Sequence, residues 1–146
     1  MKSAYRGLGS TEILLAVEAL ASLTAASLII ALLPFRTVTK LGARLGDGKR
    51  VPAVDEHKQA LACCWAVEGC ARRLPWRAVC FQQGLALQMM LHRRKFSSVM
   101  HYGVAQTQSG LKAHVWISVA GHVVLGGETA ESFAELASFP AQQISR

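Results

Sequence analysis

The sequence is short of acidic residues and of aromatic rings. Its 146 residues include 9 Asp and Glu against 16 Lys and Arg, which gives a formal charge of +7, and aromatic residues make up 7%. A basic chain favours an acidic peptide, a membrane surface or a nucleic acid as its partner. Zinc-finger spacing and RNP-like motifs are absent, and the basic residues are scattered among apolar helix positions. We therefore expect a peptide or a membrane surface rather than nucleic acid.

The cysteines lack the spacing of a metal site. The sequence has no C-x-x-C and no paired histidines to accompany them, so we expect neither a metal nor a cofactor. It also lacks a cleavable signal peptide of ordinary form, which indicates a reducing cytoplasm. Three of the four cysteines are expected to be small apolar core residues on a helix, namely Cys63, Cys64 and Cys70.

The chain contains no internal repeat and no low-complexity tract, and its length fits one compact fold. A turn-rich segment rich in Gly and Pro at residues 46–52 is the best internal boundary. We expect an apolar and basic N-terminal helical segment at 1–46 and the main domain at 47–146.

A long apolar run at residues 13–33 predicts a helix that begins at Ser10 or Thr11 and is stopped by Pro34. The run is about long enough to cross a bilayer, but Glu18 interrupts it. Positive residues flank it on both sides, so the charge rule assigns no orientation. A buried helix, a helix on a membrane surface and a transmembrane helix all remain open, and the protein is expected to be cytoplasmic with or without membrane association.

The remaining pattern places helices before strands. Three further segments have helical spacing of apolar residues: 36–45, 54–74 and 80–94. Three segments read as strands, the last two joined by a two-residue turn at Ala120-Gly121: 99–106, 113–119 and 122–125. The tail at 131–136 is expected to form a short helix. This order predicts an α+β fold with helices packed on a small antiparallel sheet.

Cys80 opens a predicted helix, and His114 lies in a predicted strand beside Trp116. A thiol attacks a carbonyl as the thiolate, which the unpaired N–H groups and the dipole of a helix N-terminus favour. The backbone N–H of Cys80 is a candidate donor for an oxyanion. An imidazole in a core strand needs a partner, which is either structural or the thiol. Each residue alone is more often structural, but together they favour a nucleophile with its general base and acid.

A third group should orient His114. With the two-residue turn, the hairpin places His114 opposite Gly127. Glu128 is one residue away and would reach His114 if the register slips or a bulge intervenes. The alternatives are a backbone carbonyl, a water, Gln82 or Gln83.

Several motifs occur together in an order that resembles a known family. They are ARRLPWRAVCFQQGLALQMMLHRR at 71–94, Tyr-Gly-Val at 102–104, Ala-His-Val-Trp-Ile at 113–117 and Val-Val-Leu-Gly-Gly-Glu at 123–128, preceded by Leu-Leu-Pro-Phe-Arg at 32–36. This combination resembles the stand-alone lasso peptide biosynthesis B2 proteins, transglutaminase-like cysteine proteases that remove the leader from a lasso precursor.

The resemblance implies a transglutaminase-like, papain-like catalytic core in which Cys80 is the nucleophile and His114 the base. Members with a full triad carry an Asp about where Gly126 stands, so the sequence departs from the pattern there. The resemblance also implies three partners: the leader of the precursor peptide, a small B1 leader-recognition protein, and the C cyclase that closes the ring with ATP.

Two functions stay open. The first is leader hydrolysis through a thioester on Cys80, with a transamidase as a close variant that would differ only in whether an amine outcompetes water. The second is a non-catalytic peptide-binding or membrane-associated scaffold of the same fold, which is suggested by the missing acid opposite His114 and by the apolar N-terminal segment.

Overall fold

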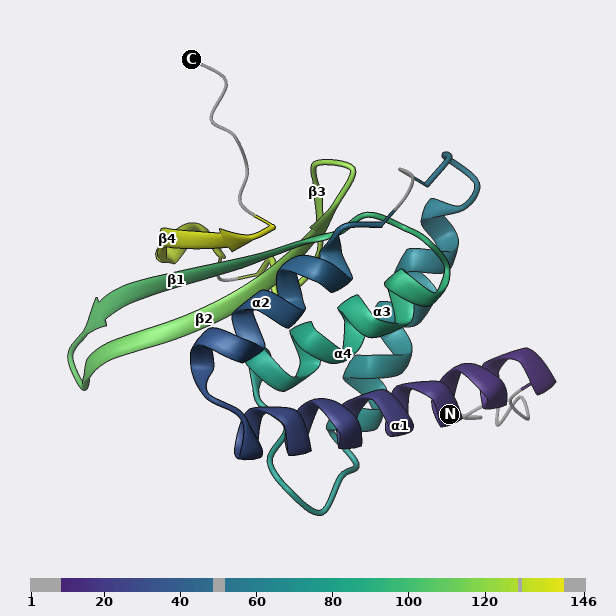
Figure 1. Cartoon of the computed structure of the whole chain (residues 1–146), viewed down its shortest axis with the longest axis horizontal. Helices are drawn as coiled ribbons and strands as arrows, with labels where there is room; N and C mark the ends of the chain where they lie inside the picture. Colours follow the sequence, from purple (N-terminus) through teal and green to yellow (C-terminus); the bar gives the residue numbers. More distant parts are fainter. Residues whose placement is uncertain (1–8, 49–51, 129, 141–146) are drawn as a thin grey trace, which may run out of the picture.

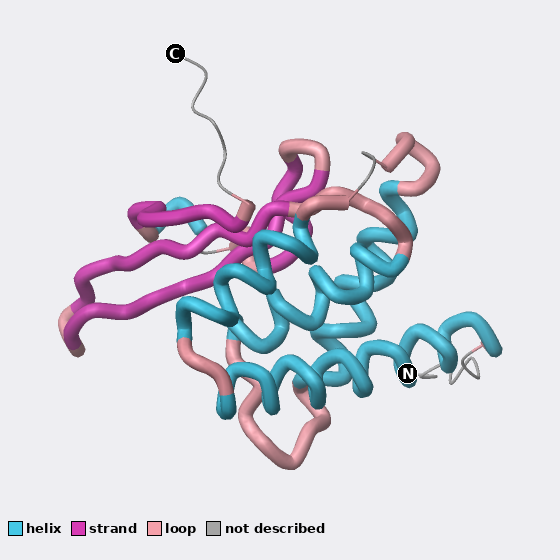
Figure 2. Tube along the Cα trace, viewed as in Figure 1, coloured by secondary structure: helices cyan, strands magenta, loops and turns pink. Residues whose placement is uncertain are grey.

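A computed structural model describes residues 9–48, 52–128 and 130–140 as helices packed on one antiparallel sheet (Figures 1 and 2). The helices are α1 (Ser10–Leu32), α2 (Phe35–Gly46), α3 (His57–Ala71) and α4 (Cys80–Arg93). The strands are β1 (Val99–Thr107), β2 (Gly110–Val119), β3 (His122–Leu125) and β4 (Ala134–Phe139), in the sheet order β3-β2-β1-β4. The predicted α+β fold is confirmed.

The hairpin between β2 and β3 turns at the predicted place. Ala120 and Gly121 both have positive φ angles, 53° and 80°, as a tight two-residue hairpin turn requires. The pairing then shifts by one residue, since Ser118 lies opposite Val123 but Ile117 lies opposite Leu125. Because of this bulge, Ile117 lies opposite a residue one position later than the turn alone would place there.

The predicted helix at 131–136 is wrong. Only a single 3-10 turn forms, at Ala130–Ser132, and the chain continues as strand β4, which pairs antiparallel with β1. The backbone N–H and C=O groups along an open edge of β1 need partners, and β4 supplies them. A short isolated helix has too few hydrogen bonds to compete with that pairing.

Helix α1 begins at Ser10, as predicted. Gly9 is the N-cap residue, and its N–H donates to the carboxylate of Glu12 at 3.0 Å. At the other end, Pro34 follows the helix as predicted and starts α2 in the new direction. Residues 49–51 of the predicted boundary segment lie outside the described residues.

Helix α1 is long and apolar enough to cross a membrane by length and composition. In this structure it packs lengthwise against α3 and α4, and Ala19, Leu23 and Ala26 are fully buried (Figure 1). The opposite side of the helix is a line of exposed apolar side chains: Ile13, Leu14, Val17, Leu20, Leu28 and Leu32. Thus α1 has one side in the core of the protein and one apolar side outside it.

An ion pair fixes α1 to α4. The guanidinium of Arg94 donates to both carboxylate oxygens of Glu18 at 2.8 Å, and Arg93 lies 3.1 Å from the same carboxylate. The hydrogen bond from Arg94 lowers the pKa of Glu18 against the opposing effect of burial, and the same bond raises the pKa of Arg94. The charge that interrupts the apolar run is therefore neutralised inside the fold.

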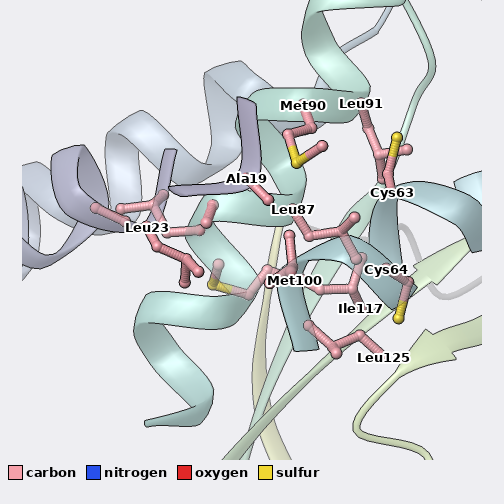
Figure 3. Packing of buried hydrophobic residues seen from close by; sticks show 14 of the residues in the cluster. Ala19, Leu23, Cys63, Cys64, Leu87, Met90, Leu91, Met100, Ile117 and Leu125 are labelled. Carbon is pink, nitrogen blue, oxygen red and sulfur yellow. The ribbon is translucent and has the colours of Figure 1, made fainter. Parts of the chain in front are cut away.

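The core forms where α4 meets α1, α3 and the sheet. Figure 3 shows Leu87, Met90 and Leu91 of α4 among side chains from the other elements, including Leu23, Cys63, Met100, Ile117 and Leu125. At Gly84, a Cβ atom would lie 3.0 Å from a methyl group of Val115. Glycine thus lets α4 approach β2 closely, just one turn after Cys80.

Candidate active site

Cys80 is the first residue of α4, as predicted, and it is half-buried. The residue before it, Val79, is extended, and its carbonyl accepts the backbone N–H of Gln83 at 3.1 Å. The side chain of Gln83 donates to the carbonyl of Ala78 at 2.9 Å. These bonds fix the chain as it enters the helix, so the thiol sits among the unpaired N–H groups of a helix N-terminus.

The other cysteines have different surroundings. Cys63 and Cys64 are buried in α3 and Cys70 is half-buried there, which confirms that they are core residues. Burial raises the pKa of Cys64 to about 12, and its Sγ donates to the carbonyl of Val124 at 2.8 Å. Burial also raises the pKa values of Cys63 and Cys70. All three favour the neutral thiol, which is the unreactive form.

His114 lies on β2 and is held on several sides. Its Nε2 lies 2.9 Å from the carbonyl oxygen of Gly126. Because a carbonyl only accepts, Nε2 is the donor in this bond. The ring stacks with that of Trp116 at 5.9 Å and contacts the ring of Phe133 at 5.1 Å. These contacts fix the orientation of the imidazole.

Gly126 stands where the family resemblance leads one to expect an Asp. Its φ angle is +75°, and a Cβ there would lie 2.8 Å from the carbonyl oxygen of Val115 and 3.2 Å from His114 Nε2. Any side chain would be strained by the backbone and crowded by its neighbours. A backbone carbonyl, one of the alternatives left open by the sequence, therefore meets His114 at the place of the missing carboxylate.

Cys80 and His114 line one cavity of about 450 Å³, so the structure brings the two predicted residues together. His114 also borders a second, polar cavity of about 510 Å³ that includes Glu128, Gln83 and Arg72. Glu128 is exposed in that second cavity, whereas Gln82 lines the first. His114 thus stands in the wall between an apolar and a polar space.

Sequence reasoning missed the residues that form the apolar side of the first cavity. Phe35, the first residue of α2, places its ring 5.9 Å from that of Phe81 and 6.0 Å from that of Tyr102. Pro34 signals that the chain changes direction before Phe35, but no local pattern shows that α1 and α2 fold back over α4.

A partly buried polar network beside the site was also missed. His101 on β1 hydrogen-bonds through Nδ1 to the carboxylate of Glu135 on β4 and through Nε2 to the hydroxyl of Ser118 on β2, at 2.7 Å for the latter. Its ring stacks on Trp116 at 5.5 Å with an interplanar angle of 8°. The network ties three strands together, and it was missed because β4 was predicted to be a helix.

In the described part of the chain, no group of three or more His, Cys, Asp and Glu side chains could hold a metal ion.

A helix that opens on a cysteine and packs against an antiparallel sheet carrying a histidine is an arrangement of thiol-dependent peptidases and acyltransferases. The family model of the transglutaminase-like superfamily matches residues 20–138, across the boundary predicted near residue 46. The chain belongs to the transglutaminase-like superfamily, which is generally a cysteine peptidase and acyltransferase fold. Searches of curated proteins and of solved structures gave no match.

Proposed function

We propose that this protein is a cysteine peptidase that removes the leader from a lasso peptide precursor, with Cys80 as the nucleophile and His114 as the general base and acid. The observation that carries the proposal is that both residues line one cavity at the N-terminus of α4. Membership of the superfamily and the order of the motifs around both residues support it.

The proposed reaction has two halves. Cys80 Sγ attacks the carbonyl carbon of the scissile peptide bond while its proton passes to His114, and the backbone N–H of Cys80 helps to hold the oxyanion. The C–N bond then breaks, and the imidazolium returns the proton to the departing amine. Water next attacks the thioester, with His114 taking its proton, and the acid product leaves as the thiol is restored.

The Gly126 carbonyl has the orienting role in this proposal. It accepts a hydrogen bond from the Nε2–H group, so Nδ1 is the nitrogen that exchanges a proton with the thiol. A neutral carbonyl stabilises an imidazolium less than a carboxylate does. Glu128, which borders the polar cavity with His114, is proposed to add negative charge on that side.

The proposal includes the partners implied by the family resemblance. In the cytoplasm, a B1-type protein would deliver the leader to the Cys80 cavity, and a C cyclase would act on the released core peptide. The net charge of +7 supports an acidic stretch in the peptide or in the B1 partner. Addition of B1 is expected to increase the rate of cleavage.

The direct test is cleavage of the cognate precursor, followed by mass spectrometry with and without B1. Cys80→Ala and His114→Ala should each reduce the rate by about a thousandfold or more. Cys70→Ala is the matched control, since it removes a half-buried thiol from another helix and should retain most of the activity. Full activity in either site variant would overturn the assignment of that residue.

A second candidate function is a scaffold that binds the precursor without cutting it. The observation that favours it is Gly126, where a carbonyl replaces the carboxylate expected from the family. If the wild type binds the precursor and B1 but releases no product, the scaffold is supported and the peptidase is rejected.

A further inference from the structure

The cavity at Cys80 is lined mainly by apolar and aromatic side chains from both halves of the chain. Helices α1 and α2 contribute Ile30, Leu33, Phe35 and Val38, and the later elements contribute Val79, Phe81, Tyr102 and Val115. The described lining residues include no Asp, Glu, Lys or Arg. A volume of about 450 Å³ is in the range of sites that bind small ligands or single side chains with part of their backbone.

Three aromatic rings gather at this cavity. Phe35 contacts Phe81 and Tyr102 at ring distances of 5.9 and 6.0 Å, yet 56% of Phe35 is exposed. Leu33, just before the turn into α2, is 42% exposed. Apolar surface that is still accessible beside a nucleophile gains free energy if a ligand covers it.

Gln82 adds a polar group to the same cavity. Its Oε1 is buried, and it has no hydrogen-bond partner among the described residues. Leaving a buried acceptor unpaired is unfavourable, so the Gln82 amide gains by turning toward a ligand that brings an N–H group. A peptide backbone offers such a group next to each side chain.

We propose that this cavity selects the substrate, taking a bulky apolar or aromatic side chain next to the scissile bond while the Gln82 amide turns to accept a backbone N–H of the same peptide. The inference rests on the proposed function, because it requires that the peptide reach Cys80. A charged side chain would lose its hydration in the cavity without gaining an oppositely charged partner from the described lining residues. Discrimination of at least about tenfold is expected from an apolar pocket.

The test compares reagents that alkylate Cys80 and differ in their side chain. Tosyl-phenylalanyl chloromethyl ketone carries an aromatic ring, tosyl-lysyl chloromethyl ketone carries an ammonium, and iodoacetamide has no side chain. Rates of Cys80 modification are read by peptide mapping and mass spectrometry on the full chain. The phenylalanyl reagent should react at least about tenfold faster than the lysyl reagent, after each rate is corrected for reaction with free cysteine.

Two variants examine the cavity wall. Phe35→Ala should reduce the preference for the phenylalanyl reagent, and Leu33→Asp should shift it towards the lysyl reagent by placing a carboxylate at the wall. Both side chains are partly exposed, so the fold is expected to persist. The matched controls are Leu136→Ala and Leu136→Asp, because Leu136 is 63% exposed on β4 and does not line the cavity.

The possible failures can be told apart. Equal rates for the two chloromethyl ketones in the wild type, or the same shift in the Leu136 variants, would overturn the selectivity of the cavity and leave the peptidase proposal standing. A Cys80 thiol that resists iodoacetamide in the native protein would contradict the peptidase itself, and the inference would fail with it.

Discussion

His101 and His114 lie on neighbouring strands, and both stack on Trp116, but their surroundings differ. His101 is buried, and both of its ring nitrogens are hydrogen-bonded to side chains of the sheet. His114 is half-buried, bonds to a backbone carbonyl and borders two cavities. Residue type and strand position therefore do not distinguish a structural histidine from a candidate base. Access to a cavity that a candidate nucleophile also lines does distinguish them.

The same contrast holds for the thiols. Cys64 and Cys80 are both helical cysteines, but Cys64 is buried and donates to a carbonyl, whereas Cys80 begins its helix at the edge of a cavity. One imidazole and one thiol are therefore buried and hydrogen-bonded, and one of each lines the Cys80 cavity. Substitution of matched pairs can show whether reactivity follows access to that cavity.

The largest difference is expected in cysteine alkylation. Iodoacetamide near neutral pH should modify Cys80 at least about a hundredfold faster than Cys63 or Cys64, because burial raises the pKa of both buried thiols and restricts their access. Peptide mapping with mass spectrometry over time gives the separate rates. Uniform slow labelling of all four cysteines would remove the contrast and favour the scaffold function.

Replacing each of the two histidines by alanine should affect a different property, stability for His101 and precursor cleavage for His114. His101→Ala should lower the free energy of unfolding by about 3 kcal/mol, because it removes two hydrogen bonds and leaves Ser118 buried without a partner. It should leave the alkylation of Cys80 nearly unchanged in the folded protein. His114→Ala should abolish precursor cleavage with a smaller loss of stability.

Urea denaturation measures the loss of stability in each variant, and the cleavage assay measures the loss of activity. His122→Ala serves as the control, since His122 is exposed on β3 and should affect neither property. Equal losses of stability and of cleavage in His101→Ala and His114→Ala would mean that the two histidines do not have separate structural and catalytic roles.

The charged pair between Glu18 and Arg94 sharpens the comparison, because it separates acid effects on the fold from those on the site. Glu18→Gln should cost about 2 kcal/mol by breaking a charged hydrogen bond to Arg94. The pKa of Glu18 is lowered in the folded state, so its contribution is present above its usual value of 4.5 and is lost as the pH falls through the lower folded value.

Urea titrations across this acidic range should therefore show a loss of stability in the wild type that is reduced in Glu18→Gln. Glu131→Gln, at an exposed position, is the matched control. Parallel pH profiles for the wild type and Glu18→Gln would contradict the role of this pair.

The smallest effect is expected from alanine substitutions at two glycines with similar backbone φ angles. Gly126 and Gly121 have φ angles of +75° and +80°, so alanine should cost about 1 kcal/mol at Gly121 and more at Gly126, where the Cβ would also lie 2.8 Å from the carbonyl oxygen of Val115. Only at Gly126 does the added Cβ approach His114, whereas Gly121 has open space. Gly126→Ala should reduce cleavage by about tenfold and Gly121→Ala should not, as measured with the precursor. Equal rates would show that the carbonyl of Gly126 does not orient the imidazole.

The parts of the fold predicted correctly depend on local chemistry. The start of α4 at Cys80 and the turn at Ala120-Gly121 follow from residues close together in the chain, and both are confirmed. They place the thiol at a helix end and the imidazole on the strand before the hairpin. The candidate pair could therefore be found without the structure.

The missed parts depend on contacts between distant segments. Strand β4 exists because the edge of β1 accepts it, and the network of His101 and Glu135 then follows. The ring of Phe35 reaches Phe81 only because α1 and α2 fold back over α4. Neither arrangement leaves a period or a turn signal in the sequence, so neither could be predicted from it.

The wall of the Cys80 cavity has a consequence for how such proteins diverge. Leu33, Phe35 and Val38 lie in the first third of the chain, whereas Cys80 and His114 lie well after it. Mutations at these three wall residues therefore fall in a stretch of gene separate from the one that encodes Cys80, His114 and the rest of the wall. In the proposed peptidase, a lineage could change its preferred peptide through this stretch while Cys80 and His114 are inherited intact, and an engineer could exchange residues 30–38 as a cassette.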